Sequence, residues 1–164
     1  MNKTEPANTA TDALQAAPAV GAQVERVVRP HRAEARKPRT FVLNFKKEFA
    51  ALVERGYKKQ TIRGHRKDGK RPAPGDQVRL YTGLRTSGTR WLRDGTVVRC
   101  RAVRLNMVGN GEIVVDGERL TQEQRFEFAK ADGFVTWEDM RKWFCDQYGA
   151  ESFPDWEGFC VEWE

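Results

Sequence analysis

The sequence predicts an α+β domain, in which a small curled sheet or β-barrel is flanked by helices, after a disordered N-terminal tail. Three observations predict this fold class. Runs rich in β-branched and aromatic residues recur along residues 40–164, two helix starts with hydroxyl caps fall between the late runs, and residues 1–38 contain no Phe, Trp or Tyr. With 164 residues, including nine Phe, five Trp and three Tyr, the chain has material for one hydrophobic core rather than two.

Residues 1–38 are rich in Ala, Thr and Pro, and they predict disorder because they cannot bury enough apolar surface to offset the entropy lost on ordering. Ordered structure is expected from residue 40, where "TFVLNF" predicts a strand. The segment "KKEFAALVER" then predicts a short helix that ends at Gly56 in a left-handed turn. "QTIRG" predicts the next strand, and "HRKDGKRPAPGD" predicts a basic loop with a turn.

The middle of the chain predicts a series of strands. Residues 77–83, "QVRLYTG", alternate apolar and polar residues as a half-buried strand does. Residues 84–95 predict a loop, and residues 96–108 predict a long strand with a bulge or bend near Ala102. Residues 111–117, "GEIVVDG", predict a strand that pairs with the long one through the turn "GNG".

Two helices are predicted next, since Thr121 with Gln124 and Thr136 with Asp139 match the capping-box spacing. The second helix is expected to bury one face. Residues 158–164, "GFCVEWE", predict a closing strand. The order of strand, helix, several strands, two helices and strand favours an α+β domain whose sheet curls toward a small barrel. In the second predicted helix, the face expected to be buried carries Trp137, Met140, Phe144 and Tyr148.

The net charge of +6 is unevenly distributed. Residues 1–39 hold seven Lys/Arg and four Asp/Glu, residues 40–104 hold 17 and five, and residues 105–164 hold five and 14. The three segments therefore carry +3, +12 and −9. A basic segment of this size attracts phosphates, so nucleic acid or a nucleotide is the leading partner class, with an ordinary solvated basic face as the alternative.

Several classes of protein and site are not expected. No apolar run approaches the roughly 18 residues of a membrane span, and no apolar signal segment is visible, so we expect no membrane partner and a cytoplasmic location. No metal site or cofactor is expected, because the cysteines and histidines are few and scattered, and the cysteines are expected to be reduced core residues. No pattern specifies an oligomeric state. The cysteines are Cys100, Cys145 and Cys160, and the histidines are His31 and His65.

The stretch "GYKKQTIRG", residues 56–64, places a hydroxyl between cations at the start of a strand. Thr61 and Arg63 are two residues apart and share a strand face, whereas Lys58 would point to the opposite face of a continuous strand. Lys58 must therefore lie in the turn after Gly56, or on a bulge, to meet Thr61. The glycine is expected to allow that turn.

These residues carry a resemblance to a known family. Gly56, Lys58, Thr61 and Arg63 match the G-x-K-x-x-T-x-R signature of the ASCH domain (activating signal cointegrator homology). The surroundings agree, with a strand and helix before the motif, "PGDQVRL" after it, "ADGF" before the last helix and an aromatic C-terminal strand. The chain thus resembles an ASCH domain over about residues 40–164.

ASCH domains resemble PUA domains, a β-barrel fold associated with RNA binding, so the resemblance implies a cleft for RNA or a modified nucleoside. One small bacterial enzyme of the family hydrolyses the acetyl amide of N4-acetylcytidine with the motif Lys, the motif Thr and a later Glu. By resemblance, Lys58, Thr61 and Asp132 of "KADGF" are the candidate catalytic residues. Asp132 is one methylene shorter than the family's Glu, so the reach of its carboxyl group and the identity of the substrate both stay open.

Four residues are candidates for substrate binding. Arg63 is expected to bind a phosphate or a base, because its pKa prevents proton transfer. Gly56 is expected to shape the same cleft. Tyr81 and Trp91 can stack on a base, with core or rim packing as the alternative.

Two functions follow from the sequence. The first is an ASCH-domain protein that binds RNA or a modified pyrimidine nucleoside in a basic cleft, with hydrolysis of an N-acyl cytidine amide as its most concrete form. The alternative is a non-catalytic RNA-binding module, in which the basic segment holds phosphates and the cleft holds one base. A ribonuclease is a third, less favoured reading.

Overall fold

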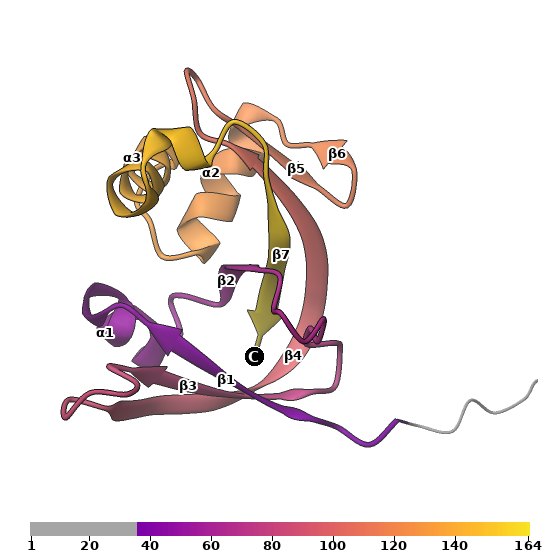
Figure 1. Ribbon diagram of the computed structural model, residues 1–164, viewed down its shortest axis with the longest axis vertical. Coiled ribbons are helices and arrows are strands. Elements are labelled where there is room, and N and C mark those ends of the chain that lie inside the picture. Colours follow the sequence, from indigo (N-terminus) through magenta and orange to yellow (C-terminus); the bar gives the residue numbers. More distant parts are fainter. Residues whose placement is uncertain (1–35) are drawn as a thin grey trace, which may run out of the picture. The chain divides into compact units, whose positions relative to one another are not determined.

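The computed structural model describes residues 36–164. The tail predicted for residues 1–38 therefore lies almost wholly outside the described residues. The helices and strands are numbered in chain order (Figure 1). The first half contains β1 (Thr40–Phe45), a 3-10 turn (Lys47–Phe49), α1 (Ala50–Glu54), β2 (Gln60–Gly64) and β3 (Gln77–Thr82). The second half contains β4 (Arg90–Asn106), β5 (Glu112–Val115), β6 (Glu118–Arg119), α2 (Gln122–Ala131), α3 (Trp137–Tyr148), a 3-10 turn (Ala150–Ser152) and β7 (Trp156–Trp163).

All seven strands belong to one sheet, in which the long strand β4 is central. The first part of β4 pairs antiparallel with β3, and its second part pairs antiparallel with β7 and β5. Strand β1 pairs parallel with β3, β2 pairs antiparallel with β7, and β6 pairs with β5. Because β4 bends along its length, the sheet curls, and α2 and α3 lie together on one side of it (Figure 1).

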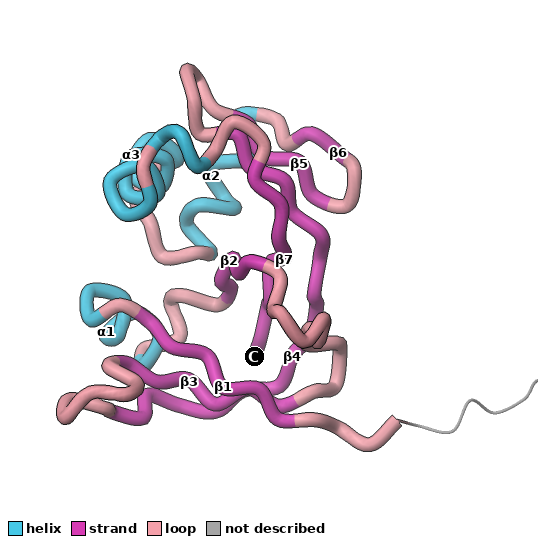
Figure 2. The backbone as a smooth tube through the Cα atoms, viewed as in Figure 1, coloured by secondary structure: helices cyan, strands magenta, loops and turns pink. Residues whose placement is uncertain are grey.

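The curled sheet stays open, and the fold is the α+β class that the sequence predicts. Among the described strands, β1 pairs with β3 and β2 pairs with β7, but β1 and β2 do not pair with each other. Figure 2 shows these two strands with the loops that lead into and out of them. The candidate site lies beside the unpaired edges of β1 and β2.

The core consists of two apolar clusters, one at each end of the curled sheet. The first packs α1 against β1, β3 and the ends of β4 and β7, with Val53, Val78 and Leu80 fully buried. The second packs α2 and α3 against β5 and the remainder of β4 and β7. Phe134 and Trp143 pack against both clusters. These two aromatic side chains therefore connect the helical layer to the end of the sheet that carries α1.

Most predicted elements are confirmed, and two predictions in the middle of the chain are wrong. The predicted loop over residues 84–95 is strand from Arg90 onward, because β3 pairs with this segment and Leu92 is buried in the core. The irregularity predicted near Ala102 lies instead between Val97 and Arg99, where β4 changes register against β7. A further register shift occurs against β3.

The two helix starts are confirmed, since both capping boxes form. Thr121 accepts from the backbone N–H of Gln124, and Thr136 accepts from that of Asp139. The prediction that α3 buries Tyr148 is wrong, because this side chain is 52% exposed at the end of the helix. None of the helices within residues 36–164 is both long enough and apolar enough to cross a membrane.

Candidate active site

The backbone after α1 carries Lys58 into the site as the sequence predicts. Gly56 ends the helix with a φ of 72°, a conformation that residues with a Cβ rarely adopt. The N–H groups of Tyr57 and Lys58 then both donate to the carbonyl of Leu52, at 2.9 and 3.1 Å. Strand β2 begins only at Gln60. Lys58 therefore lies in the turn before the strand, and its side chain does not follow the alternating side-chain directions of β2.

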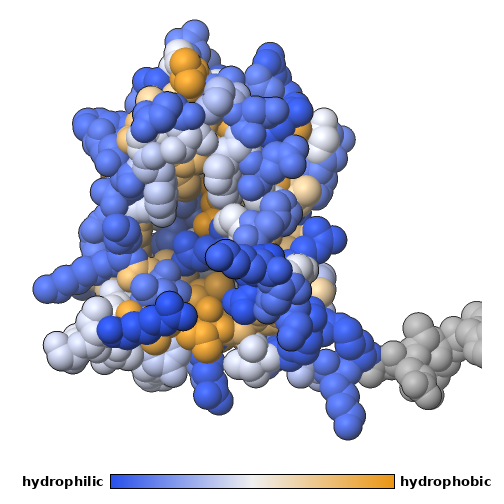
Figure 3. Space-filling model, viewed as in Figure 1, coloured by the Kyte–Doolittle hydropathy of each residue, from blue (hydrophilic) through white to orange (hydrophobic). Residues whose placement is uncertain are grey.

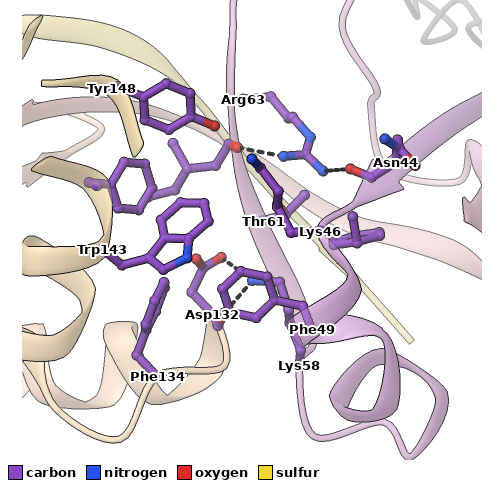
Figure 4. A pocket seen from close by; sticks show the side chains of 13 residues that line it. Asn44, Lys46, Phe49, Lys58, Thr61, Arg63, Asp132, Phe134, Trp143 and Tyr148 are labelled. Carbon is purple, nitrogen blue, oxygen red and sulfur yellow. Dashed lines mark hydrogen bonds and ion pairs between the residues drawn. The ribbon is translucent and has the colours of Figure 1, made fainter. Parts of the chain in front are cut away.

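This turn leads into a pocket of about 230 Å³ between the end of β1, strand β2, the end of α2 and one face of α3. Figure 4 shows the pocket with Lys58 and Asp132 facing each other, Arg63 beside Asn44, and aromatic side chains of α3 opposite. Of the candidate residues, Lys58, Thr61, Arg63 and Asp132 line it. The other lining residues are Asn44, Phe45, Lys46, Phe49, Ile62, Phe134, Trp143, Phe144 and Tyr148.

Lys58 and Asp132 form a buried ion pair across 74 positions of sequence. The Lys58 Nζ lies 3.0 Å from the Asp132 Oδ1 and also donates to the backbone carbonyl of Asp132. The two side chains are 3% and 5% exposed. No donor within residues 36–164 forms a well-aligned hydrogen bond with Oδ1, so this buried oxygen keeps its capacity to accept.

Asp132 is positioned by the end of a helix. It is the C-cap residue of α2, and its N–H donates to the carbonyl of Phe128 at 3.1 Å. Gly133 follows with a φ of 93°, and a Cβ there would lie 3.2 Å from the Cδ of Lys58. The turn after α2 therefore holds the carboxyl group against the lysine, with no space for a larger residue beside the lysine's stem.

Aromatic rings surround the Lys58 ammonium group. Its Nζ lies 4.8 Å from the ring centre of Phe49, 5.9 Å from that of Phe134 and 6.0 Å from that of Phe45. Such rings attract a cation weakly, but they solvate it far less well than water does. The rings therefore make the site a dry one.

Burial shifts both titrating groups of the pair toward their neutral forms. Removal from water lowers the pKa of Lys58, and the charge of Asp132 only partly offsets this. The same loss of water raises the pKa of Asp132, against the opposing charges of Lys58 and Arg63. An ion pair and a neutral amine–acid pair differ only by one proton moved across the short contact. Because the two groups interact this closely, the pair titrates as a unit.

Thr61 contributes a hydroxyl group to the same pocket. Its side chain is only 3% exposed, and it lines the pocket from strand β2. Within residues 36–164 the hydroxyl makes no hydrogen bond to another side chain or to the backbone. It is therefore free to interact with a ligand, whereas the nearby Gln60 side chain is occupied, since it donates to the carbonyl of Phe128 at 3.0 Å.

Arg63 closes one side of the pocket. Its Nη2 donates to the carbonyl of Asn44 at 2.7 Å, and its Nη1 donates to the carbonyl of Ile62 at 3.3 Å. The guanidinium also lies over the ring of Phe45, 5.2 Å from the ring centre. These contacts fix the group and leave three of its five N–H donors for a ligand.

The wall opposite is aromatic and comes from α3. Trp143 is half-buried and is held by a 2.7 Å hydrogen bond from its Nε1 to Glu48, and Tyr148 is exposed at the rim. Phe144 lies between them. The helical spacing of these residues is visible in the sequence, but it indicates a buried face equally well. Sequence analysis therefore missed the wall.

Three candidate binding residues lie outside the pocket. Tyr81 and Trp91 are cross-strand partners on β3 and β4, and the exposed Trp91 donates to Asp94. Gly56 does not line the pocket either, and acts through the turn that carries Lys58. Within residues 36–164, no three His, Cys, Asp or Glu side chains are placed to hold a metal ion.

Comparison with known proteins gives little. No protein-family model matches the chain. No curated protein matches it either. Among solved structures, the chain is similar to protein EF3133 of the DUF984 family, from Enterococcus faecalis V583, with 16% sequence identity and a TM-score of 0.46 over 77% of this chain and 78% of that chain. Membership of the ASCH family therefore stays a prediction from the motif.

Proposed function

We propose that the pocket binds a modified pyrimidine nucleoside, free or within RNA, and hydrolyses an N-acyl amide on its base. The observation that carries this proposal is that Lys58, Thr61 and Asp132 are buried and line one pocket. A hydroxyl becomes a useful nucleophile only when a base removes its proton, and a lysine acts as a base only when its pKa is lowered. Burial lowers the pKa of Lys58 as this role requires.

The first half of the reaction uses the neutral form of the buried pair. The Thr61 oxygen attacks the amide carbonyl carbon while the Lys58 amine takes the hydroxyl proton. The C–N bond then breaks as the Asp132 carboxylic acid gives its proton to the leaving nitrogen. The products are an acyl ester on Thr61, the free amine of the base, and the pair in its ionic form.

The second half restores the enzyme with one water molecule. One proton moves from the Lys58 ammonium group to the Asp132 carboxylate, which regenerates the neutral pair. Lys58 then takes a proton from water as the water oxygen attacks the ester carbonyl. Asp132 returns its proton to the Thr61 oxygen as the C–O bond breaks, and a final transfer from Lys58 to Asp132 resets the pair. The net reaction consumes one amide and one water and yields an acid and an amine.

The walls of the pocket favour a flat substrate with polar edges. Trp143 supplies a ring face of the kind on which nucleobases stack, and Arg63 supplies donors for a carbonyl oxygen or a phosphate. The volume of about 230 Å³ lies below the roughly 300–1,000 Å³ of sites for drug-sized ligands, so it suits a base and an acyl group rather than several rings.

The shorter carboxyl side chain is compatible with this chemistry. The family's Glu is replaced by Asp132, but Lys58 lies in the turn and comes to 3.0 Å from the carboxyl group. That distance is within the roughly 2.6–3.2 Å that direct proton transfer needs. The carboxyl group of Asp132 is therefore within reach of Lys58 despite its shorter side chain.

The test is an assay of purified protein with N4-acetylcytidine, following the release of cytidine by chromatography. We expect turnover by the wild type, loss of about a thousandfold in rate for Thr61→Val, and partial retention for Thr61→Ser. The Val and Ser variants form a matched pair, because both fill the site and only Ser keeps a hydroxyl. Intact substrate at high enzyme concentration would rule out this substrate, and equal rates for the two variants would rule out nucleophilic attack by Thr61.

A second function, RNA binding without chemistry, is favoured by the exposed loop between β2 and β3. Its residues 65–71 carry Arg66, Lys67, Lys70 and Arg71, with Asp68 as the single acidic residue. In this case the protein would bind RNA with a steep loss of affinity as salt concentration rises, and N4-acetylcytidine would stay intact.

A further inference from the structure

A second hollow of about 210 Å³ lies directly beside the deep pocket. The two hollows share Asn44 and Arg63 as lining residues. The remainder of the second hollow is formed by residues 41–43 of β1, Gly64 at the end of β2, Arg66 in the loop that follows, Pro72 and Phe159. The shared residues mean that one side-chain layer separates the occupants of the two hollows.

The hollow exists because the sheet does not close. Strands β1 and β2 each leave one edge unpaired among the described strands, and Arg63 reaches across the seam between these edges. Its guanidinium donates to the carbonyl of Asn44 on β1 and to that of Ile62 on β2. The carbonyl oxygens of two strand edges thus face the same side chain. Arg63 is both the bridge of the seam and the wall between the two hollows.

The second hollow has an apolar floor and a basic rim. Phe41, Leu43 and Phe159 form the floor and are nearly fully buried, while Val42 is half-exposed at the side. Figure 3 shows an apolar area in the lower half of this face, with strongly hydrophilic side chains around it. At the rim, the exposed Arg66 pairs with Asp68 at 3.0 and 3.1 Å. An exposed pair of this kind contributes little, so a ligand anion can replace the aspartate.

We propose that this seam is a second subsite, which takes the nucleotide next to the one held in the deep pocket. The phosphate that links the two nucleotides lies between the guanidinium groups of Arg63 and Arg66, and the adjoining sugar and base cover the apolar floor. The proposal rests on the proposed function, and it specifies the preferred ligand as a single-stranded oligonucleotide rather than a free nucleoside.

Charge and geometry both favour a polymer over a second small molecule. Two hollows that share a wall can be filled by neighbouring units of one chain, and the group between such units in a nucleic acid is an anion. The two guanidinium groups at this place match that charge. The basic loop 65–71 continues from the rim, and its positive field attracts a polyanion to this side of the molecule.

The experiment compares the affinities of two ligands, N4-acetylcytidine and a pentaribonucleotide with N4-acetylcytidine at its centre, by titration calorimetry at fixed salt. Binding is measured with Thr61→Val protein, so that neither ligand is consumed. We expect the pentanucleotide to bind at least roughly tenfold more tightly, as one charge-assisted contact to phosphate would give.

Three variants, each made in the Thr61→Val protein, test which residues cause the tighter binding of the pentanucleotide. Arg66→Gln is expected to remove most of the tenfold advantage, and Val42→Trp is expected to do the same by filling the hollow. The matched control is Arg71→Gln, which removes the same charge from the same loop at a residue that does not line the hollow. None of the three is expected to change the affinity for the free nucleoside. Thermal unfolding of each protein checks that it is folded.

The outcomes separate this inference from the proposed function. Equal affinities for the two ligands, or equal losses with Arg66→Gln and Arg71→Gln, would overturn the second subsite and leave nucleoside binding intact. Failure of both ligands to bind would overturn the proposed function and this inference together. If the pentanucleotide binds but Trp143→Ala does not weaken it, the base does not occupy the deep pocket, and both proposals fail in that form.

Discussion

Two buried carboxyl groups of this protein, Asp76 and Asp132, lie in opposite environments. Asp76 is fully buried in the turn before β3, where it accepts from the N–H of Arg39 at 2.8 Å and that of Ala73 at 3.0 Å. The guanidinium groups of Arg36 and Arg39 lie 2.8 and 3.2 Å from its oxygens. Burial by itself would raise the pKa of Asp76, but these donors hold it at about 2.

Asp132 is almost as deeply buried, but one side chain pairs with it. That partner is Lys58, and the Asp132 Oδ1 has no well-aligned donor among the described residues. Here burial prevails and raises the pKa of the carboxyl group. The comparison teaches that burial alone does not fix the protonation of an acid, because the donors around it count as well. The donors around Asp76 suit a structural role, whereas the proposed chemistry uses Asp132 as a group that can exchange a proton.

The largest expected difference concerns activity. Asp132→Asn is expected to lower the rate of N4-acetylcytidine hydrolysis about a thousandfold, because the amide cannot carry the proton to the leaving nitrogen. Asp76→Asn is expected to leave the rate within about twofold, measured where the variant is folded. Asp132→Glu serves as the control that keeps the carboxyl group, and it should retain more activity than Asp132→Asn. Equal losses from Asp76→Asn and Asp132→Asn would end the distinction between the two sites.

The next difference concerns stability. Asp76→Asn is expected to lower the free energy of unfolding by about 3 kcal/mol, because two arginines and two N–H groups lose their anionic partner. The double variant Lys58→Met/Asp132→Leu replaces the other pair by apolar side chains of similar size, and is expected to be as stable as the wild type or more so. Denaturant titrations at neutral pH measure both. A large loss in the double variant would mean that the Lys58–Asp132 pair is needed for folding.

A third difference concerns the glycines beside the two acids. Gly75 and Gly133 have φ values of 85° and 93°, so alanine is strained at both and is expected to cost about 1 kcal/mol or more. A Cβ at Gly75 would meet nothing within 4 Å, whereas at Gly133 it would crowd the Lys58 stem and, at 3.3 Å, Leu52. Gly133→Ala is therefore expected to cost roughly twice as much and to reduce activity. Similar losses of stability for Gly75→Ala and Gly133→Ala would show that the turn after α2 can shift to accommodate the added methyl group.

A fourth difference is confined to acid pH. The folded-state pKa of Asp76 lies below the ordinary 3.8, so its stabilisation is present above pH 3.8 and is lost as the pH falls toward 2. The raised pKa of Asp132 has the opposite sign, because the folded state then binds its proton more tightly than the unfolded chain does. Denaturant titrations between pH 2 and 5 should show a weaker loss of stability on acidification for Asp76→Asn than for the wild type. Parallel curves would contradict the lowered pKa.

Much of this fold could be predicted from local pattern. The alternation of "QVRLYT", the two capping boxes and the glycine after α1 depend on neighbours within a few residues, and the structure contains each of them. The extent of β4 could not be predicted in the same way. Residues 90–95 include three charged residues and a glycine, and they form a strand because β3 lies alongside and pairs with them.

In the candidate site, too, some residues could be predicted from local pattern and others depend on tertiary contacts. The motif named Lys58, Thr61 and Arg63, and the alternation of strand β2 required Lys58 to lie in the preceding turn. The sequence could not name Trp143 as a wall of the pocket, because an aromatic residue at helical spacing predicts a buried face first. It also could not exclude Tyr81 and Trp91, since their distance from the pocket depends on how the sheet curls.

The sequence by itself therefore determined the α+β class, the order of elements and the chemical groups of the motif, because these depend on propensities and spacings along the chain. The tertiary structure alone decided that Asp132 meets Lys58 in a dry pocket, that Asp76 is saturated with donors, and that an open seam lies beside the site. Each of these depends on contacts between segments far apart in the chain, and on how much water they exclude. Donors from distant segments hold the carboxyl group of Asp76 as an anion, burial raises the pKa of the same group at Asp132, and no local pattern encodes that difference.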